Sequence, residues 1–117
     1  MSLSTHVLDA SLGRPAQGVP IHLKRSGDSA AHANSSPIFT AFTDPDGRYR
    51  HQETGKDVPL AAGIYELTFD TAAYFAGSGQ VGFYPKVTVT FEITDVTAHH
   101  HVPLLLSPFA FSTYRGS

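Results

Sequence analysis

The sequence contains no cysteine, no tryptophan and only one methionine. Without cysteine the chain cannot form disulfides, thiolate nucleophiles or Cys-ligated zinc and iron–sulfur sites. Charge is also scarce, because eight Lys and Arg residues and ten Asp and Glu residues make up 15% of the chain and leave a formal net charge of −2. Since the sequence has no run of basic residues, we expect neither nucleic acid nor a membrane as a partner.

Long apolar runs are missing as well. No stretch approaches the roughly 20 residues that span a bilayer. Met1–His6 has neither the positive region nor the apolar region of a signal peptide, so we expect a cytoplasmic protein. A length of 117 residues, 41% of them hydrophobic, excludes a disordered chain and predicts a single domain over residues 1–117.

The chain does contain the alternation that is typical of β-strands. In Lys86–Ile93 the apolar residues share one face and the polar residues share the other, which predicts one buried and one solvated face. Shorter alternating runs occur at Val19–Lys24 and Gly63–Phe69, and two more strands are expected at Leu3–Leu8 and Pro37–Thr43. The pattern predicts an all-β protein.

Turn residues and one helical segment complete this organisation. Asp44–Gly47 reads Asp-Pro-Asp-Gly and is expected to close a hairpin whose return strand begins at Arg48. Ser26–Ser36 is small and polar, which predicts a loop. The only expected helix is Thr71–Gly77, capped by Asp70 or by its own first residue. Together these elements predict a β-sandwich with one short helix.

Seven histidines are many for this length, and three of them are consecutive. In a strand, His99 and His101 would share one face while His100 points to the other. Two imidazoles on one face can ligate a metal, supply a general base with a partner, or lie on a solvated surface. A metal would need further ligands that the sequence does not place, so no metal site is expected. Solvated positions are expected for three others: His22, His32 and His51.

Two further residues are candidates because of the residues that share a strand face with them. His6 lies inside the expected first strand, where it shares a face with Ser4 and Leu8. A half-buried histidine in such a position is usually a hydrogen-bonded structural residue. Arg48 shares a face with Arg50 and by itself would be an ordinary surface charge.

The C-terminal segment is unusually aromatic for a chain end. Phe109, Phe111 and Tyr114 precede the final Arg115–Ser117. Because chain ends usually fray into polar residues, this segment is expected to be buried, either in the sheet or against another subunit. An edge strand explains Phe109 and Phe111, but it does not explain the ending Tyr-Arg-Gly-Ser.

These segments together resemble the 5-hydroxyisourate hydrolase family of transthyretin-like enzymes. The resemblance covers the whole chain and is carried by six segments: Leu3–Asp9, Gly13–Ala16, Thr43–Arg48, Phe69–Phe75, Phe83–Pro85 and His99–Ser117. Tyr114–Ser117 matches the family's hallmark tetrapeptide, which transthyretin itself lacks. The resemblance implies a transthyretin-type β-sandwich of two four-stranded sheets with one short helix. It also implies a homotetramer, arranged as a dimer of dimers, and no cofactor.

The resemblance further implies hydrolysis of a small molecule, 5-hydroxyisourate, to 2-oxo-4-hydroxy-4-carboxy-5-ureidoimidazoline in urate degradation. The matching catalytic positions are His6, Arg48, His101 and Ser117. The matching substrate-binding positions are His6, Arg48, Tyr114 and Arg115, and the supporting ones are His99 and Gly116. A neutral imidazole suits the activation of water, and a nearby arginine disfavours its protonation and matches a planar carbonyl edge. Either His6 or His101 can be the base.

The alternative is a transthyretin-like carrier that binds a small aromatic ligand without catalysis. The chain also departs from the family pattern at two places. His100 stands where an aromatic residue is common, and Phe109–Phe111 replaces a more usual Tyr-Gly-Tyr, which removes two hydroxyls. Neither departure touches a matched catalytic position.

Overall fold

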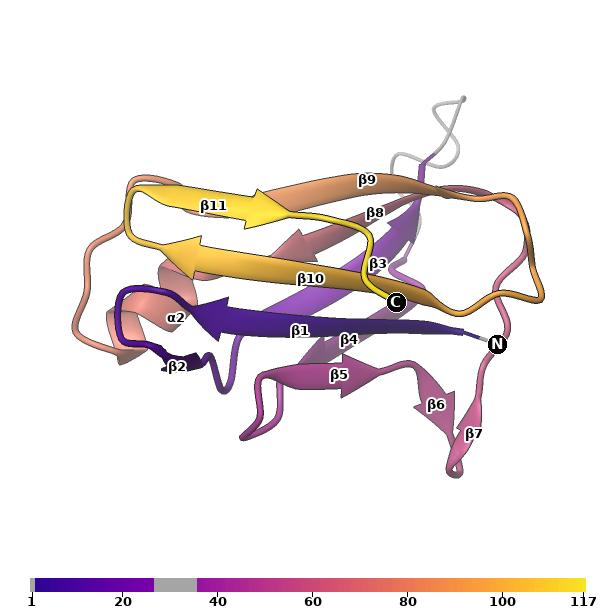
Figure 1. Cartoon of the computed structure of the whole chain (residues 1–117), viewed down its shortest axis with the longest axis horizontal. Coiled ribbons are helices and arrows are strands. Elements are labelled where there is room, and N and C mark those ends of the chain that lie inside the picture. Colours follow the sequence, from indigo (N-terminus) through magenta and orange to yellow (C-terminus); the bar gives the residue numbers. More distant parts are fainter. Residues whose placement is uncertain (1, 27–35) are drawn as a thin grey trace.

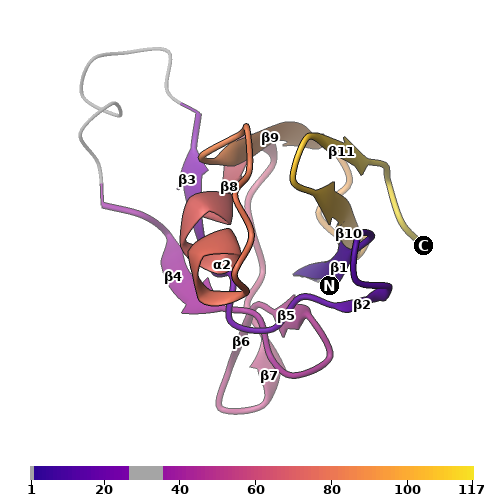
Figure 2. The same cartoon turned by 90° about the vertical axis from the view of Figure 1, so that its left-hand side faces the viewer.

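The structure is a computed structural model that describes residues 2–26 and 36–117. Two sheets face each other across a hydrophobic interior, and one short helix lies at one end, as Figures 1 and 2 show. The predicted sandwich with a short helix is therefore confirmed. Most of the predicted Ser26–Ser36 loop, including His32, lies outside the described residues. In the part of the chain that is described, no helix is long and apolar enough to cross a membrane.

The first sheet is built around β1 (Leu3–Asp9). β1 pairs in parallel with β10 (His100–Ser107), and β10 pairs antiparallel with β11 (Ala110–Thr113). Two short strands share the other edge of β1, with β2 (Arg14–Pro15) at one end and β5 (Arg48–Arg50) at the other. The sheet thus has four strand positions, and the fourth is divided between β2 and β5 (Figure 1). This topology joins the first strand of the chain to the C-terminal strands.

The second sheet is antiparallel, in the order β4-β3-β8-β9. Its strands are β4 (Phe39–Phe42), β3 (Pro20–Arg25), β8 (Gly63–Phe69) and β9 (Val87–Ile93). A separate two-stranded hairpin follows β5 and consists of β6 (Gln52–Glu53) and β7 (Lys56–Asp57). All of the predicted strands form, with ends that differ by no more than two residues from the predicted ones.

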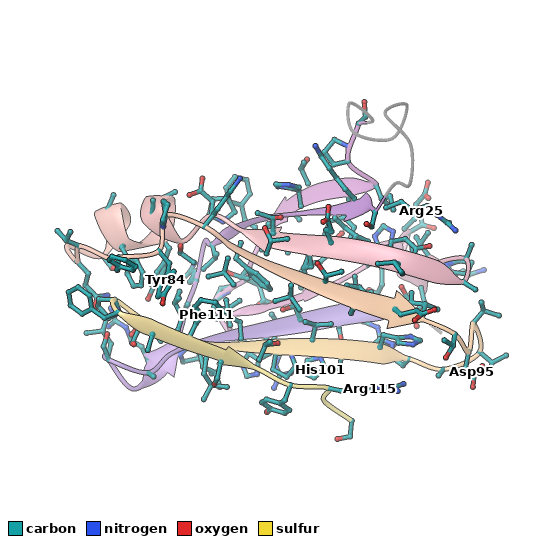
Figure 3. All side chains as sticks on the ribbon, turned by 90° about the horizontal axis from the view of Figure 1, so that it is seen from above. Arg25, Tyr84, Asp95, His101, Phe111 and Arg115 are labelled. Carbon is teal, nitrogen blue, oxygen red and sulfur yellow. The ribbon has the colours of Figure 1, made fainter. Side chains whose placement is uncertain are left out.

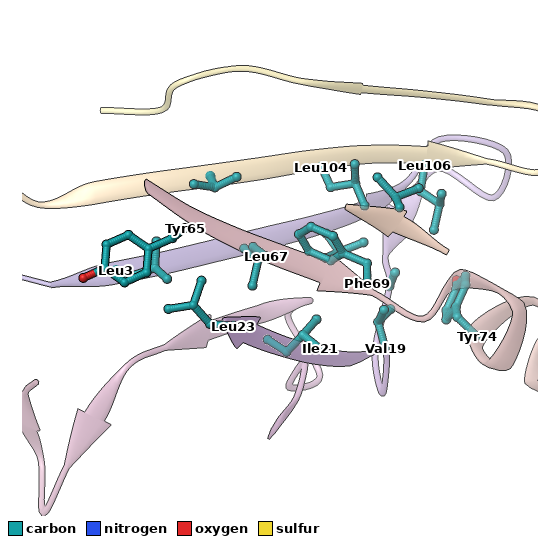
Figure 4. Close-up of a cluster of buried hydrophobic side chains, with 14 of the residues drawn as sticks. Leu3, Val19, Ile21, Leu23, Tyr65, Leu67, Phe69, Tyr74, Leu104 and Leu106 are labelled. Atoms are coloured by element: carbon teal, nitrogen blue, oxygen red, sulfur yellow. The ribbon is translucent and has the colours of Figure 1, made fainter. Parts of the chain in front are cut away.

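The alternation of apolar and polar residues places the core between the sheets. Along β1, residues at odd positions are buried, whereas Ser4, His6 and Leu8 are only partly buried on the outer face. β9 shows the same division, with Val87 and Ile93 buried at its ends. The core combines aliphatic and aromatic side chains from both sheets, several of which are labelled in Figure 4. Burying each large apolar side chain contributes about 1.5–3 kcal/mol to the stability of the fold. Because this burial takes place between the sheets, the outer face of β1 can carry polar side chains.

The turn at Asp44–Gly47 forms, but the predicted hairpin was wrong. Gly47 has a φ of 76°, and its N–H donates to the Asp44 carbonyl at 2.8 Å. The following strand β5 then pairs with β1 in the first sheet, whereas the preceding strand β4 belongs to the second. The cause is the close approach of Gly47 to β1: a Cβ there would lie 2.3 Å from the Val7 carbonyl oxygen. The turn therefore delivers Arg48 to the edge of β1.

The helix α2 (Thr71–Gly77) has the predicted bounds and is capped by Asp70, whose side chain accepts a hydrogen bond from the Ala73 N–H. Its Tyr74 hydroxyl donates to the buried Asp9 carboxylate at 2.6 Å. This bond ties the helix to the end of β1. The helix therefore closes the end of the sandwich to which β1 runs.

One expectation about exposure was wrong, and one alternative of another does not hold. His51 is buried rather than solvated, because its ring packs against Phe39 at 4.7 Å between ring centroids, and its Nε2 has no hydrogen-bond partner among residues 2–26 and 36–117. The aromatic C-terminal segment forms the expected edge strand, β11, but Phe109, Phe111 and Tyr114 remain exposed in a single chain. These aromatic rings are therefore not buried within the protomer's own sheet. Contact with another subunit is the alternative that remains as a prediction.

Candidate active site

Three strands bring the predicted residues together on the outer face of the first sheet. His6 of β1 is directly opposite Arg48 of β5, and Ser4 is opposite Arg50. On the other side of β1, Ser4 is in register with His101 of β10. Since alternate residues of a strand point to the same face, these side chains form one polar surface.

Ser4 links two of the histidines. Its hydroxyl lies 2.7 Å from Nε2 of His99 and 2.8 Å from Nδ1 of His101. The predicted sharing of one face by these two imidazoles is confirmed, and His100 is buried on the opposite face. Sequence reasoning missed Ser4 as a site residue, although its position two residues before His6 was the available signal.

His6 is positioned by the turn before β5 rather than by Ser4. Its Nε2 lies 2.9 Å from the backbone carbonyl oxygen of Asp46, in the turn before β5. The same turn supplies the Asp44 carboxylate, which accepts a hydrogen bond from the Arg48 N–H at 2.9 Å. The turn thus orients both His6 and the backbone of Arg48, while the Arg48 side chain stays exposed.

Electrostatics favour the neutral forms of His99 and His101. Burial lowers the pKa of His101 below its ordinary value of about 6.5, and the positive charge of Arg48 lowers it further. Burial and the charge of Arg50 likewise lower the pKa of His99. Arg50 itself is paired with Asp57 through two hydrogen bonds of 2.8 Å. An unprotonated imidazole beside an exposed guanidinium can take up a proton or donate its single N–H at neutral pH.

The effect of Arg48 on His101 can be measured directly. We expect the pKa of His101 to rise toward 6.5 in Arg48→Gln, because removing a positive charge makes imidazolium less unfavourable. The measurement is an NMR titration of the histidine ring protons. Lys24→Gln is the matched control, since Lys24 lowers the pKa of His22 on the other sheet and should leave His101 unchanged. An unchanged His101 titration in Arg48→Gln would contradict the proximity of the two charges.

The C-terminal tail returns to this surface beyond β11. The Gly116 N–H donates to the His101 carbonyl at 2.9 Å, and His101 and Arg115 lie close together in Figure 3. A Cβ at Gly116 would lie 2.3 Å from the His101 ring, so glycine is needed for this approach. Tyr114, Arg115 and Ser117 are exposed, and the Ser117 side chain makes no hydrogen bond within the described residues.

A cavity of about 310 Å³ opens beside the tail. It lies between β10 and the tail on one side and β9 on the other, and its lining consists of nine residues: His100, His101, Val102, Thr113, Tyr114, Arg115, Val89, Phe91 and Glu92. His6 and Arg48 do not line it and lie on the open face of the sheet. Within residues 2–26 and 36–117, no group of three or more His, Asp or Glu side chains could hold a metal ion.

Known proteins resemble this chain in both sequence and structure. The model of the HIUase/Transthyretin family matches residues 3–116. The 5-hydroxyisourate hydrolase of Mus musculus is 44% identical over 115 residues, which cover 98% of this chain and 94% of that protein. The uric acid degradation bifunctional protein TTL of Arabidopsis thaliana is also 44% identical, over 124 residues; the match covers 98% of this chain but only 37% of that longer protein.

Among solved structures, the 5-hydroxyisourate hydrolase of Klebsiella pneumoniae has a TM-score of 0.82 at 38% identity, and the match covers all of both chains. Sea bream transthyretin in complex with thyroxine has the same TM-score at 31% identity, over 99% of this chain and 95% of that one. These neighbours confirm the predicted transthyretin-type sandwich. The chain belongs to the HIUase/Transthyretin family.

Proposed function

We propose that this protein hydrolyses 5-hydroxyisourate to 2-oxo-4-hydroxy-4-carboxy-5-ureidoimidazoline in urate degradation. The observation that carries the proposal is the convergence of His6, Arg48 and His101 with the Tyr114–Ser117 tail on one sheet face. Relatives of nearly the same length that are named 5-hydroxyisourate hydrolase support the same activity.

The side chains present suit each part of this reaction. One neutral imidazole of His6 or His101 acts as the general base for water, an effect worth about 10²–10⁴ in rate. Arg48 donates to the carbonyl that becomes an oxyanion. Tyr114 and Arg115 bind and orient the planar ring, and Ser117 completes the polar end of the site. Gly116 supports His101 by allowing the tail to approach it.

A carrier function is supported less well. Sea bream transthyretin, whose structure contains thyroxine, shares the fold at 31% identity. A carrier needs no water-activating imidazole, yet here two histidines with lowered pKa values are coupled by a serine next to an arginine. This arrangement favours hydrolysis over ligand transport.

We also propose that residues 1–117 act as one hydrolase domain within a homotetramer, a dimer of dimers. Exposed aromatic rings support such an assembly: Tyr84 contacts Phe83 and Phe111 edge to face, at 5.0 and 5.1 Å between centroids, and Phe109 is exposed in the turn between β10 and β11. The open position of His6 and Arg48 also calls for a second wall from another subunit. A cytoplasmic location is also proposed, and the lack of cysteine is compatible with a reducing compartment.

A coupled assay tests the activity. Urate oxidase generates 5-hydroxyisourate from urate, and the decay of its ultraviolet absorbance is followed with and without this protein. We expect faster decay that persists in excess chelator, because the proposed reaction uses only side chains and water. Decay at the spontaneous rate, with protein that is folded and tetrameric, would favour the carrier. Loss of activity to chelator and its return with zinc would instead point to a metal.

A further inference from the structure

A chain of hydrogen bonds runs along the site from the start of β1 to His101. The Ser2 N–H points at Nδ1 of His99 at 3.4 Å, and Nε2 of His99 and Nδ1 of His101 both contact the Ser4 hydroxyl. The groups in this series of hydrogen bonds differ in whether they can donate, accept or do both. A backbone N–H can only donate, and a serine hydroxyl has one proton to donate while also accepting.

Which group donates in each of these hydrogen bonds follows from the first bond, the one made by the Ser2 N–H. Because the Ser2 N–H donates, Nδ1 of His99 accepts, and the proton of neutral His99 is on Nε2. That N–H donates to the Ser4 oxygen, so the Ser4 hydroxyl proton is directed to Nδ1 of His101. His101 therefore accepts at Nδ1 and carries its proton on Nε2.

His6 is assigned by an independent contact. A carbonyl oxygen only accepts, so the contact of 2.9 Å with the Asp46 carbonyl requires the proton of His6 to be on Nε2. The lone pair of neutral His6 is then on Nδ1, which has no hydrogen-bond partner within residues 2–26 and 36–117. Nε2 of His101 also has no hydrogen-bond partner among the described residues. Within that part of the chain, His6 therefore has an available lone pair, and His101 has an available N–H.

We propose that Ser4 is a positioning residue that fixes the tautomer of His101, so that His101 is the hydrogen-bond donor and His6 is the general base. This inference rests on the proposed hydrolysis and divides its chemistry between the two histidines. His99 acts as a second positioning residue, because it determines which way the Ser4 hydroxyl donates.

The reaction balances with these roles. Nδ1 of His6 takes a proton from water while the water oxygen bonds to C6 of 5-hydroxyisourate, and the C6 carbonyl becomes an oxyanion. The His101 Nε2–H and the Arg48 guanidinium donate to that oxyanion. As the carbonyl re-forms, the N1–C6 bond breaks, and the His6 imidazolium returns its proton to N1. The product is the ring-opened carboxylic acid, which loses a proton to solvent.

Kinetics give the first test, on a wild-type protein that has been shown to hydrolyse 5-hydroxyisourate. We expect Ser4→Ala to lower kcat about 10- to 100-fold with little change in KM, because the substrate still meets the same binding groups. Ser4→Thr, which keeps the hydroxyl on a strand-favouring side chain, should restore most of kcat. Thr40→Ala is the matched control, since it removes an exposed hydroxyl from β4 in the other sheet. A Ser4→Ala enzyme with unchanged kcat would overturn the proposal.

A second test does not depend on activity. Long-range proton–nitrogen NMR of the ¹⁵N-histidine-labelled protein above pH 8 distinguishes protonated from unprotonated ring nitrogens, with resonances assigned by single histidine substitutions. We expect Nε2–H and bare Nδ1 for both His6 and His101, and loss of the single tautomer of His101 in Ser4→Ala. A proton on Nδ1 of His101 would overturn the assignment and make His101 the base. Failure of the hydrolysis assay would refute the proposed function, while this spectrum would still report the tautomers.

Discussion

Deletion of Tyr114–Ser117 is expected to abolish turnover of 5-hydroxyisourate and to leave the sandwich folded. The last strand, β11, ends at Thr113, so the deletion leaves every β10–β11 pair in place and removes only the isolated bridge between Gly116 and His101. It does remove the Gly116 N–H that donates to the His101 carbonyl. It also removes two walls of the cavity beside His101, Tyr114 and Arg115. Without them the substrate loses its orientation against the histidines, and effects of this kind reach several kcal/mol in the barrier.

The coupled assay measures the loss, and circular dichroism with size-exclusion chromatography checks the fold and assembly. A double variant, Tyr114→Gly with Arg115→Ser, is the control for chain length, because it keeps Gly116 and Ser117. We expect it to be as inactive as the deletion if the Tyr114 and Arg115 side chains orient the substrate. A truncated protein with full activity would show that the tail has no part in the reaction.

Arg48→Ala is expected to lower kcat/KM by about 10³-fold, the size of effect seen when one oxyanion donor is removed. Arg48 is opposite His6 in the register of β1 and β5, and its charge helps to keep His101 unprotonated. Arg48→Lys should recover only part of the activity, because an ammonium cannot donate two parallel hydrogen bonds to a planar edge.

The matched control for this charge change is Arg14→Ala. Arg14 is an exposed arginine in β2, at the opposite end of the same edge of β1. We expect its activity to equal that of the wild type, with the oligomeric state of all three variants unchanged. A near-normal rate in Arg48→Ala would mean that another group stabilises the oxyanion.

The alternation of side chains made much of the fold predictable. The strand at Val87–Ile93 forms because apolar residues recur at every second position, and Asp70 caps the helix at the expected place. The pairing of strands was less predictable. Turn chemistry at Asp44–Gly47 specifies the local backbone, but the partner of β5 depends on how Gly47 packs against Val7.

The candidate site was also predictable only in part from the sequence. The resemblance to a known family pointed to His6, Arg48 and His101, and the structure places them on one face. The sequence placed Ser4 on the face of His6 but did not show its contacts, since these form only when the partner strand brings His99 and His101 within 2.8 Å of its hydroxyl. Burial of His51 depends in the same way on Phe39, which belongs to a different sheet.

The parallel pairing of β1 with β10 has a consequence for biosynthesis. Ser4 and His101, which touch in the site, are 97 residues apart in the chain. β1 must therefore wait, with one edge unpaired, until β10 has also left the ribosome. Proteins dominated by such distant contacts fold in about milliseconds to seconds, and their nascent chains are exposed to aggregation for longer. Because β1 and β10 each supply part of the site, it forms only after both strands and the Tyr114–Ser117 tail have been synthesised.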